Sequence, residues 1–158
     1  MTSAKIMHMR VQFWSKHYDG PKFHALLTDC PYEISFMNRR WDGRGVSFDP
    51  ETWAGFLKHM HPGAFGMTFG PSRMDSLWRI AAAIEQAGFI LHPSIFGWAY
   101  GSGFPKATRV RNNGEDVPAF KGHRYGLQAL KPALEPIIVF QKPYQGRPVD
   151  NITATGAG

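Results

Sequence analysis

The fold is decided by the stretch Phe23-His24-Ala25-Leu26-Leu27-Thr28-Asp29-Cys30-Pro31-Tyr32, an apolar run followed by a short turn. Its first six residues are typical of a buried strand in a sheet that is covered on both faces. The turn then follows at the carboxyl end of that strand. Because ligands of open α/β sheets bind at the carboxyl ends of strands, we expect a site at Asp29 to Tyr32.

Helices and strands alternate after this stretch, which predicts an α/β sheet with right-handed crossovers. The predicted boundaries rest on capping residues, prolines and glycines. The expected features are a helix that begins at Asp49-Pro50 and ends at Pro62-Gly63, a strand over 64–69, a helix that opens with a capping box at Ser72 to Asp75 and ends at Gly88, strands over 89–100 interrupted by Pro93, a long loop over 101–125, and a strand over 136–140.

Composition limits the class of protein. The chain has 158 residues and is 43% hydrophobic, which is enough for one core and too apolar for disorder. No apolar run approaches the ~18 residues of a membrane-spanning helix, and residues 1–10 lack the apolar core of a signal peptide. Because Cys30 has no second cysteine to pair with, we expect a reducing, cytoplasmic compartment. His59 and His61 are spaced unfavourably for a metal pair on a helix, and no metal site is expected.

Positive charge is concentrated in the later part of the chain. The formal charge is +6 and the pI is about 9.7. Residues 101–148 contain 8 basic residues and 3 acidic ones, in a segment rich in Gly, Pro and Asn. A basic surface attracts polyanions, nucleic acid among them, although charge alone also fits a mildly basic protein without such a partner.

The turn after the first strand has a specific chemistry. The Asp29 carboxylate accepts hydrogen bonds, Pro31 stiffens the turn, and the Tyr32 ring can stack on a flat group. Such a site suits a nucleobase amine, because two acceptors on its hydrogens favour a pyramidal nitrogen whose lone pair can attack an electrophilic methyl group. The alternatives are that Asp29 is a simple turn residue and that Cys30 with His24 forms a thiol nucleophile.

The sequence resembles the site-specific DNA methyltransferases of phages and prophages, which modify the exocyclic amines of adenine or cytosine. Their signature, Asp/Asn/Ser-Pro-Pro-Tyr/Phe, corresponds here to Asp29-Cys30-Pro31-Tyr32. Further family motifs follow in the same order and extend the resemblance over roughly residues 24–143: Trp41-Asp42-Gly43, Pro62-Gly63, Phe69-Gly70, Ala87-Gly88-Phe89, Trp98 to Lys106 and Ala129 to Ile137.

This resemblance implies a Rossmann-like sheet, S-adenosyl-L-methionine as methyl donor and double-stranded DNA as partner. It implies that Asp29 and the carbonyl of Cys30 or Pro31 accept from the target amine, and that Tyr32 stacks on a base flipped out of the duplex. Aspartate at the first motif position favours adenine N6 over cytosine N4. The resemblance also implies a role in restriction-modification and a location in the cytoplasm of a bacterium or of a phage-infected host. The expected DNA contacts are Phe104 at the base and, at phosphates, Lys106, Arg109, Arg111, Lys121 and Arg124.

Two departures from the family pattern qualify this interpretation. Cys30 stands where the first proline is usual, which makes the turn less rigid. The family's glycine-rich segment, Phe-x-Gly-x-Gly, is not found: Gly101-Ser102-Gly103 belongs to another motif and Gly156-Ala157-Gly158 ends the chain. Cofactor-binding residues therefore stay unassigned.

We accordingly expect an incomplete methyltransferase sheet: a partial catalytic domain over 1–150, loop-rich over 101–128, with a frayed tail over 151–158. The missing half would leave an exposed strand edge or apolar face. The alternatives are a truncated, non-catalytic DNA-binding remnant, one subunit of a split enzyme whose second polypeptide supplies the cofactor half, and an RNA methyltransferase of the same fold.

Overall fold

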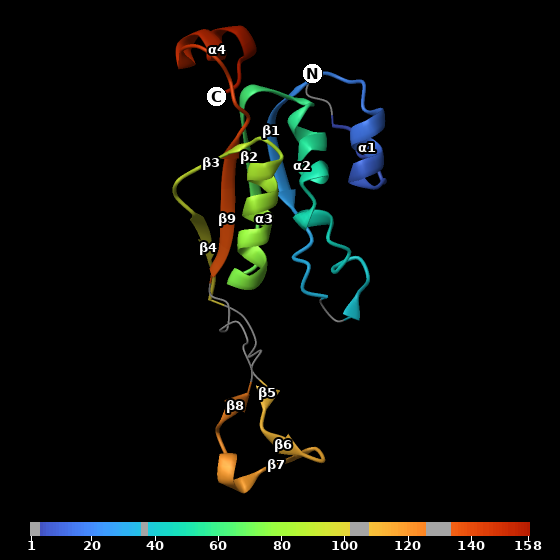
Figure 1. Ribbon diagram of the computed structural model, residues 1–158, viewed down its shortest axis with the longest axis vertical. Helices are drawn as coiled ribbons and strands as arrows, with labels where there is room; N and C mark the ends of the chain where they lie inside the picture. Colours follow the sequence, from blue (N-terminus) through green and yellow to red (C-terminus); the bar gives the residue numbers. More distant parts are fainter. Residues whose placement is uncertain (1–3, 36–37, 102–107, 126–133) are drawn as a thin grey trace.

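The computed structural model describes residues 4–35, 38–101, 108–125 and 134–158 (Figure 1). Its main body is a sheet with helices, and smaller strands lie in a separate segment (Figure 1). The elements of the main body are α1 Val11–His17, β1 Phe23–Asp29, η2 Val46–Phe48, α2 Pro50–Leu57, β2 Met60–Phe69, α3 Met74–Gln86, β3 Ile90–Leu91, β4 Phe96–Ala99, β9 Leu134–Gln141 and α4 Pro148–Thr155.

Among the described residues the main sheet has five strands, in the order β1-β2-β9-β3, with β4 also paired to β9. β1 and β2 are parallel and are connected through α2, whereas β9 runs antiparallel to β2, β3 and β4. The predicted α/β class is confirmed. The direction of β9 brings its first residues to the edge of the sheet where β1 and β2 end.

Local sequence explains where the two central helices begin and end. Asp49 caps α2 by accepting from the N–H of Glu51, and Pro50 occupies the first turn, as predicted. The predicted capping box of α3 is wrong, because the Ser72 hydroxyl donates to the carbonyl of Leu134 instead. Gly88 follows the end of α3 with φ +101°, a conformation that glycine adopts without strain.

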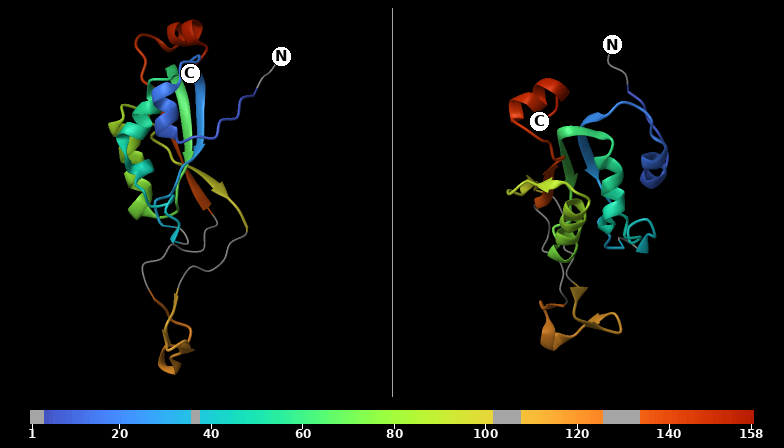
Figure 2. Two further views of the ribbon diagram at one scale, coloured as in Figure 1. Left: turned by 90° about the vertical axis from the view of Figure 1, so that its right-hand side faces the viewer. Right: turned by 45° about the horizontal axis from the view of Figure 1, so that its top comes forward.

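The core lies between the sheet and the helices α2 and α3, which pack on one side of it (Figure 2). Trp53 of α2 meets Phe140 of β9 with ring centroids 5.8 Å apart, and Ile80 and Ile84 of α3 are fully buried. The Trp53 indole N–H donates to the carbonyl of Ser47 at 2.9 Å, so the largest core side chain has its polar atom satisfied. The helix that precedes Pro62-Gly63 ends earlier than predicted, at Leu57, and both residues belong to β2.

The opposite face of the sheet is uncovered among the described residues. Leu27 of β1 is 76% exposed and its register partner Met67 of β2 is 42% exposed. The prediction that residues 23–28 are buried on both faces is therefore wrong. Alternation along the strands places Leu27 and Met67 on the face away from α2 and α3.

Two further expectations need correction. Residues 151–158 do not form a frayed tail: α4 extends to Thr155, and Asn151 Nδ2 donates to the carbonyls of Pro62 and Ala157 at 3.2 and 2.9 Å. The described part of the 101–125 loop contains regular structure, namely β5 Thr108–Arg109, β6 Arg111–Asn112, β7 Glu115–Asp116, η3 Pro118–Phe120 and β8 Arg124–Tyr125. No helix in the described ranges is long and apolar enough to cross a membrane.

Candidate functional site

Asp29 lies at the carboxyl end of β1, on the uncovered face of the sheet. It is exposed and pairs in register with Phe69 of β2, which in turn pairs with Ile137 of β9. Since alternate residues share a face, Glu135, which is two residues before Ile137 in β9, lies on the same face. The ends of three strands thus bring two carboxylates, Asp29 and Glu135, to one edge of the sheet.

Tyr32 lies beside both carboxylates. Burial raises the pKa of the Tyr32 phenol, and the negative charges of Asp29 and Glu135 together with a hydrogen bond to Asp29 raise it further. The Tyr32 carbonyl accepts from the hydroxyl of Ser76 in α3 at 2.5 Å, which fixes the turn to the helix layer. Tyr32 is therefore a neutral ring held close to the Asp29 carboxylate, as a stacking residue requires.

Aromatic side chains of β2 and β4 complete this edge. Trp98 packs against Phe69 with ring centroids 6.0 Å apart and against Tyr100 at 5.1 Å, and it is 53% exposed. The Tyr100 hydroxyl donates to Glu135 Oε1 at 3.3 Å. No role was assigned to Trp98, Tyr100 or Glu135 from the sequence, although all three lie within the two long family-like motifs. Their positions in those motifs were the signal that could have identified them.

Cys30 and Pro31 have different roles from Asp29. The Cys30 thiol points towards the sheet core, where it accepts from the Thr68 hydroxyl at 3.3 Å and where burial raises its pKa. A protonated, buried thiol is a poor nucleophile. The Pro31 carbonyl already accepts from the Ser47 hydroxyl at 2.7 Å. Of the two carbonyls proposed to bind an amine, that of Cys30 is therefore the better candidate.

The residues expected to contact DNA lie in a different part of the chain. Phe104 and Lys106 fall outside the described residues. Arg109 and Arg111 both pair with Asp116, at 3.8 and 3.0 Å, so one carboxylate partly neutralises them. In the backbone register of the two strands, Arg124 of β8 lies opposite Arg109 of β5. Lys121, which follows η3, is exposed. Figure 1 shows this β5–β8 segment apart from the five-stranded sheet.

The chain was compared with known proteins. No protein-family model matches it, and no curated protein does. Among solved structures it resembles a methyltransferase from Pyrococcus furiosus, with a TM-score of 0.43 and 13% identity, covering 79% of this chain and 43% of that one. It also resembles M1.HpyAVI, with a TM-score of 0.48 and 16% identity, covering 84% of this chain and 50% of that one. The chain thus spans half or less of the length of these structures. Likeness at this level gives no information about activity.

Proposed function

We propose that this chain carries the target-base half of a methyltransferase active site that modifies an exocyclic nucleobase amine, adenine N6 in preference to cytosine N4, in duplex DNA. The observation that carries the proposal is the position of Asp29, Cys30, Pro31 and Tyr32 at the carboxyl end of β1. An acceptor and a neutral aromatic ring meet there at an exposed strand end.

The chemistry follows from the geometry. The Asp29 carboxylate and the Cys30 carbonyl accept from the two hydrogens of the amine, which concentrates the lone pair on nitrogen. The Tyr32 ring stacks on the base, a contact worth about 1–3 kcal/mol per base. Because the raised pKa of Tyr32 keeps the phenol neutral, its ring approaches the base without adding a charge.

The described residues fit only part of the implied donor. S-adenosyl-L-methionine, when bound, supplies a methyl group on a positively charged sulfonium. The Asp29 and Glu135 carboxylates and the Phe69 and Trp98 rings suit such a cation. β1 is followed by Cys-Pro-Tyr, and β2 by Gly70-Pro71, so neither strand leads into the glycine-rich turn that would hold the rest of the donor.

The proposal is tested by transfer of labelled methyl groups from S-adenosyl-L-methionine to duplex DNA and to RNA, with nucleoside mass spectrometry to identify the product. We expect N6-methyladenine in DNA and a loss of about 10²-fold in Asp29→Ala, as when one electrostatic contact to a reacting group is removed. Asp19→Ala, at an exposed loop position before β1, is the matched control. Full activity of Asp29→Ala would exclude the assigned role, and methylated RNA alone would favour an RNA methyltransferase.

A second candidate function is favoured by the open side of the sheet. Among the described residues β1 pairs with β2 alone, and the adjoining face carries the exposed Leu27, Met67 and Trp98. An open edge beside an apolar face can receive another polypeptide. The chain would then be one subunit of a split enzyme. Calorimetry with S-adenosyl-L-methionine separates the cases: binding by this chain supports autonomous catalysis, and its absence in folded protein supports the second candidate.

A further inference from the structure

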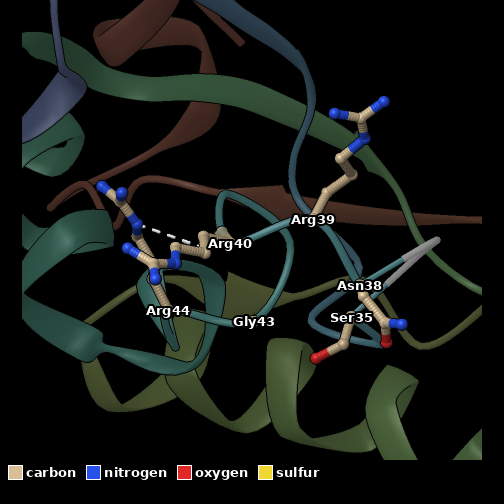
Figure 3. Close-up of a pocket in the computed structure, with 6 residues that line it drawn as sticks. All are labelled: Ser35, Asn38, Arg39, Arg40, Gly43 and Arg44. Atoms are coloured by element: carbon tan, nitrogen blue, oxygen red, sulfur yellow. Dashed lines mark hydrogen bonds between the residues drawn. The ribbon is translucent and has the colours of Figure 1, made fainter.

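The loop between Tyr32 and α2 holds a basic concavity that the sequence did not single out. Arg39, Arg40 and Arg44 fall within six residues of one another, around Trp41-Asp42-Gly43. With Ser35, Asn38 and Gly43 they line an open pocket of about 440 Å³ (Figure 3). All three arginines are exposed.

The acidic groups of this loop are used to hold its backbone. The Glu33 carboxylate accepts from the N–H groups of Gly45 and Ser47, at 2.7 and 3.0 Å. Asp42 is 1% exposed, and its Oδ1 accepts from the N–H of Glu33 at 2.7 Å. Both carboxylates therefore face inward, and the outer surface of the loop is left to the arginines.

The side chains of Arg40 and Arg44 extend to the same side of the loop, whereas that of Arg39 points elsewhere (Figure 3). Arg44 Nε donates to the Arg40 carbonyl at 3.2 Å, which holds the two residues together. Within the described ranges, the ion pairs found involve other arginines, at positions 73, 109, 111 and 147. Two neighbouring guanidinium groups without a carboxylate repel each other, and an anion between them relieves that repulsion. Their planar donor forks match phosphate oxygens.

The position of the loop indicates which phosphate. The Ser47 hydroxyl donates to the Pro31 carbonyl, so the loop is tied to the same turn that presents Tyr32. A base flipped into a site at Tyr32 keeps its own phosphodiesters at the rim of that site. Trp41 is 57% exposed between Arg40 and Arg44, and an aromatic ring among basic residues is typical of nucleic-acid surfaces.

We propose that Arg40 and Arg44 bind a backbone phosphodiester of the strand that carries the target base, an inference that rests on the proposed function. An open, exposed pocket favours a phosphate that other contacts on the same polymer hold in place, over a free phosphate ion. The proposal adds a contact outside the β5–β8 segment.

The test is fluorescence anisotropy with a labelled 20-base-pair DNA duplex, titrated over NaCl concentration without methyl donor. Each phosphate contact contributes about 0.9 to the slope of log K against log salt. We expect the double variant Arg40→Gln/Arg44→Gln to lower the slope by about that amount and to bind several-fold more weakly. Arg44→Lys keeps the charge and loses the donor fork, so it should keep the slope and bind more weakly.

Arg10→Gln is the control for a lost charge, because it removes one positive charge from an exposed position at the start of α1. An unchanged slope in the double variant, or an equal fall in Arg10→Gln, would overturn the proposal. Displacement of the duplex by inorganic phosphate at constant ionic strength would also overturn it, since it would indicate a free-anion site. A lowered slope in protein that never methylates DNA would contradict the proposed function and would still support the phosphate site.

Discussion

Glu33 joins the candidate base site to the basic loop, and removing its carboxylate should weaken both the fold and the loop. Its two oxygens accept from the N–H groups of Gly45 and Ser47 at 2.7 and 3.0 Å. Hydrogen bonds to a charged group contribute about 1.5–3 kcal/mol each, and the half-buried position of Glu33 argues for the lower value. We expect Glu33→Ala to lower the free energy of unfolding by about 3 kcal/mol and Glu33→Gln, which keeps one acceptor, by about 1.5 kcal/mol.

Urea denaturation at pH 7 measures these losses, with equal dependence on urea as the check that the unfolding reaction is unchanged. Glu85→Gln, exposed on α3, is the control and should change stability by no more than about 0.5 kcal/mol. Glu33→Gln and Glu33→Ala that are equally stable would refute the assignment of one bond to each oxygen. The same Glu33→Ala protein should bind duplex DNA with the lowered salt slope of the double arginine variant.

Three further predictions concern other parts of the chain. The Cys30 thiol has a pKa raised by burial, so its thiolate forms at higher pH than in the unfolded chain; alkylation by iodoacetamide at pH 8 should be markedly slower in folded protein, and equal rates would contradict the burial. Leu27→Ser should change stability by no more than about 0.5 kcal/mol because Leu27 is exposed, whereas Ile80→Ala in the core should cost about 2–5 kcal/mol in thermal or urea unfolding. Asn151→Ala should destabilise the protein by about 1–2 kcal/mol, because it removes the hydrogen bonds to the carbonyls of Pro62 and Ala157. An unaffected melting temperature would instead support the prediction of a frayed tail over 151–158.

Much of the fold could be predicted because its signals are local. The apolar run at 23–28, the cap at Asp49 and the glycine at position 88 each fix the conformation of a few residues, and the structure agrees. The capping box at Ser72 failed because a distant partner, the Leu134 carbonyl, competes for the same hydroxyl. The prediction that β1 is covered on both faces was wrong, because an apolar run shows that a strand can be buried and does not show which neighbours are present.

The candidate site likewise contains residues that local sequence brings together and residues that meet only through the fold. Asp29 and Tyr32 are three positions apart in sequence, and their proximity follows from one turn. Glu135 joins them only because β9 runs antiparallel and begins at the edge where β1 ends. Arg40 and Arg44 lie in a stretch without periodicity, and their arrangement depends on two inward-facing carboxylates that sequence alone does not orient.

The strand-end edge is acidic and the neighbouring loop is basic, and this difference in charge decides the orientation in which a nucleotide could be held. The strand-end edge carries two carboxylates and aromatic rings, which suit a base amine and a cationic donor and repel a phosphate. The loop carries the guanidinium groups of Arg40 and Arg44, which attract a phosphate and repel a cationic donor. Tyr32 and Glu33 are consecutive residues, one held by Ser76 and the other by Asp42, so the two surfaces keep a fixed relation to each other. A nucleotide placed with its base at Tyr32 and its phosphate at the arginines satisfies both, and the reversed orientation satisfies neither.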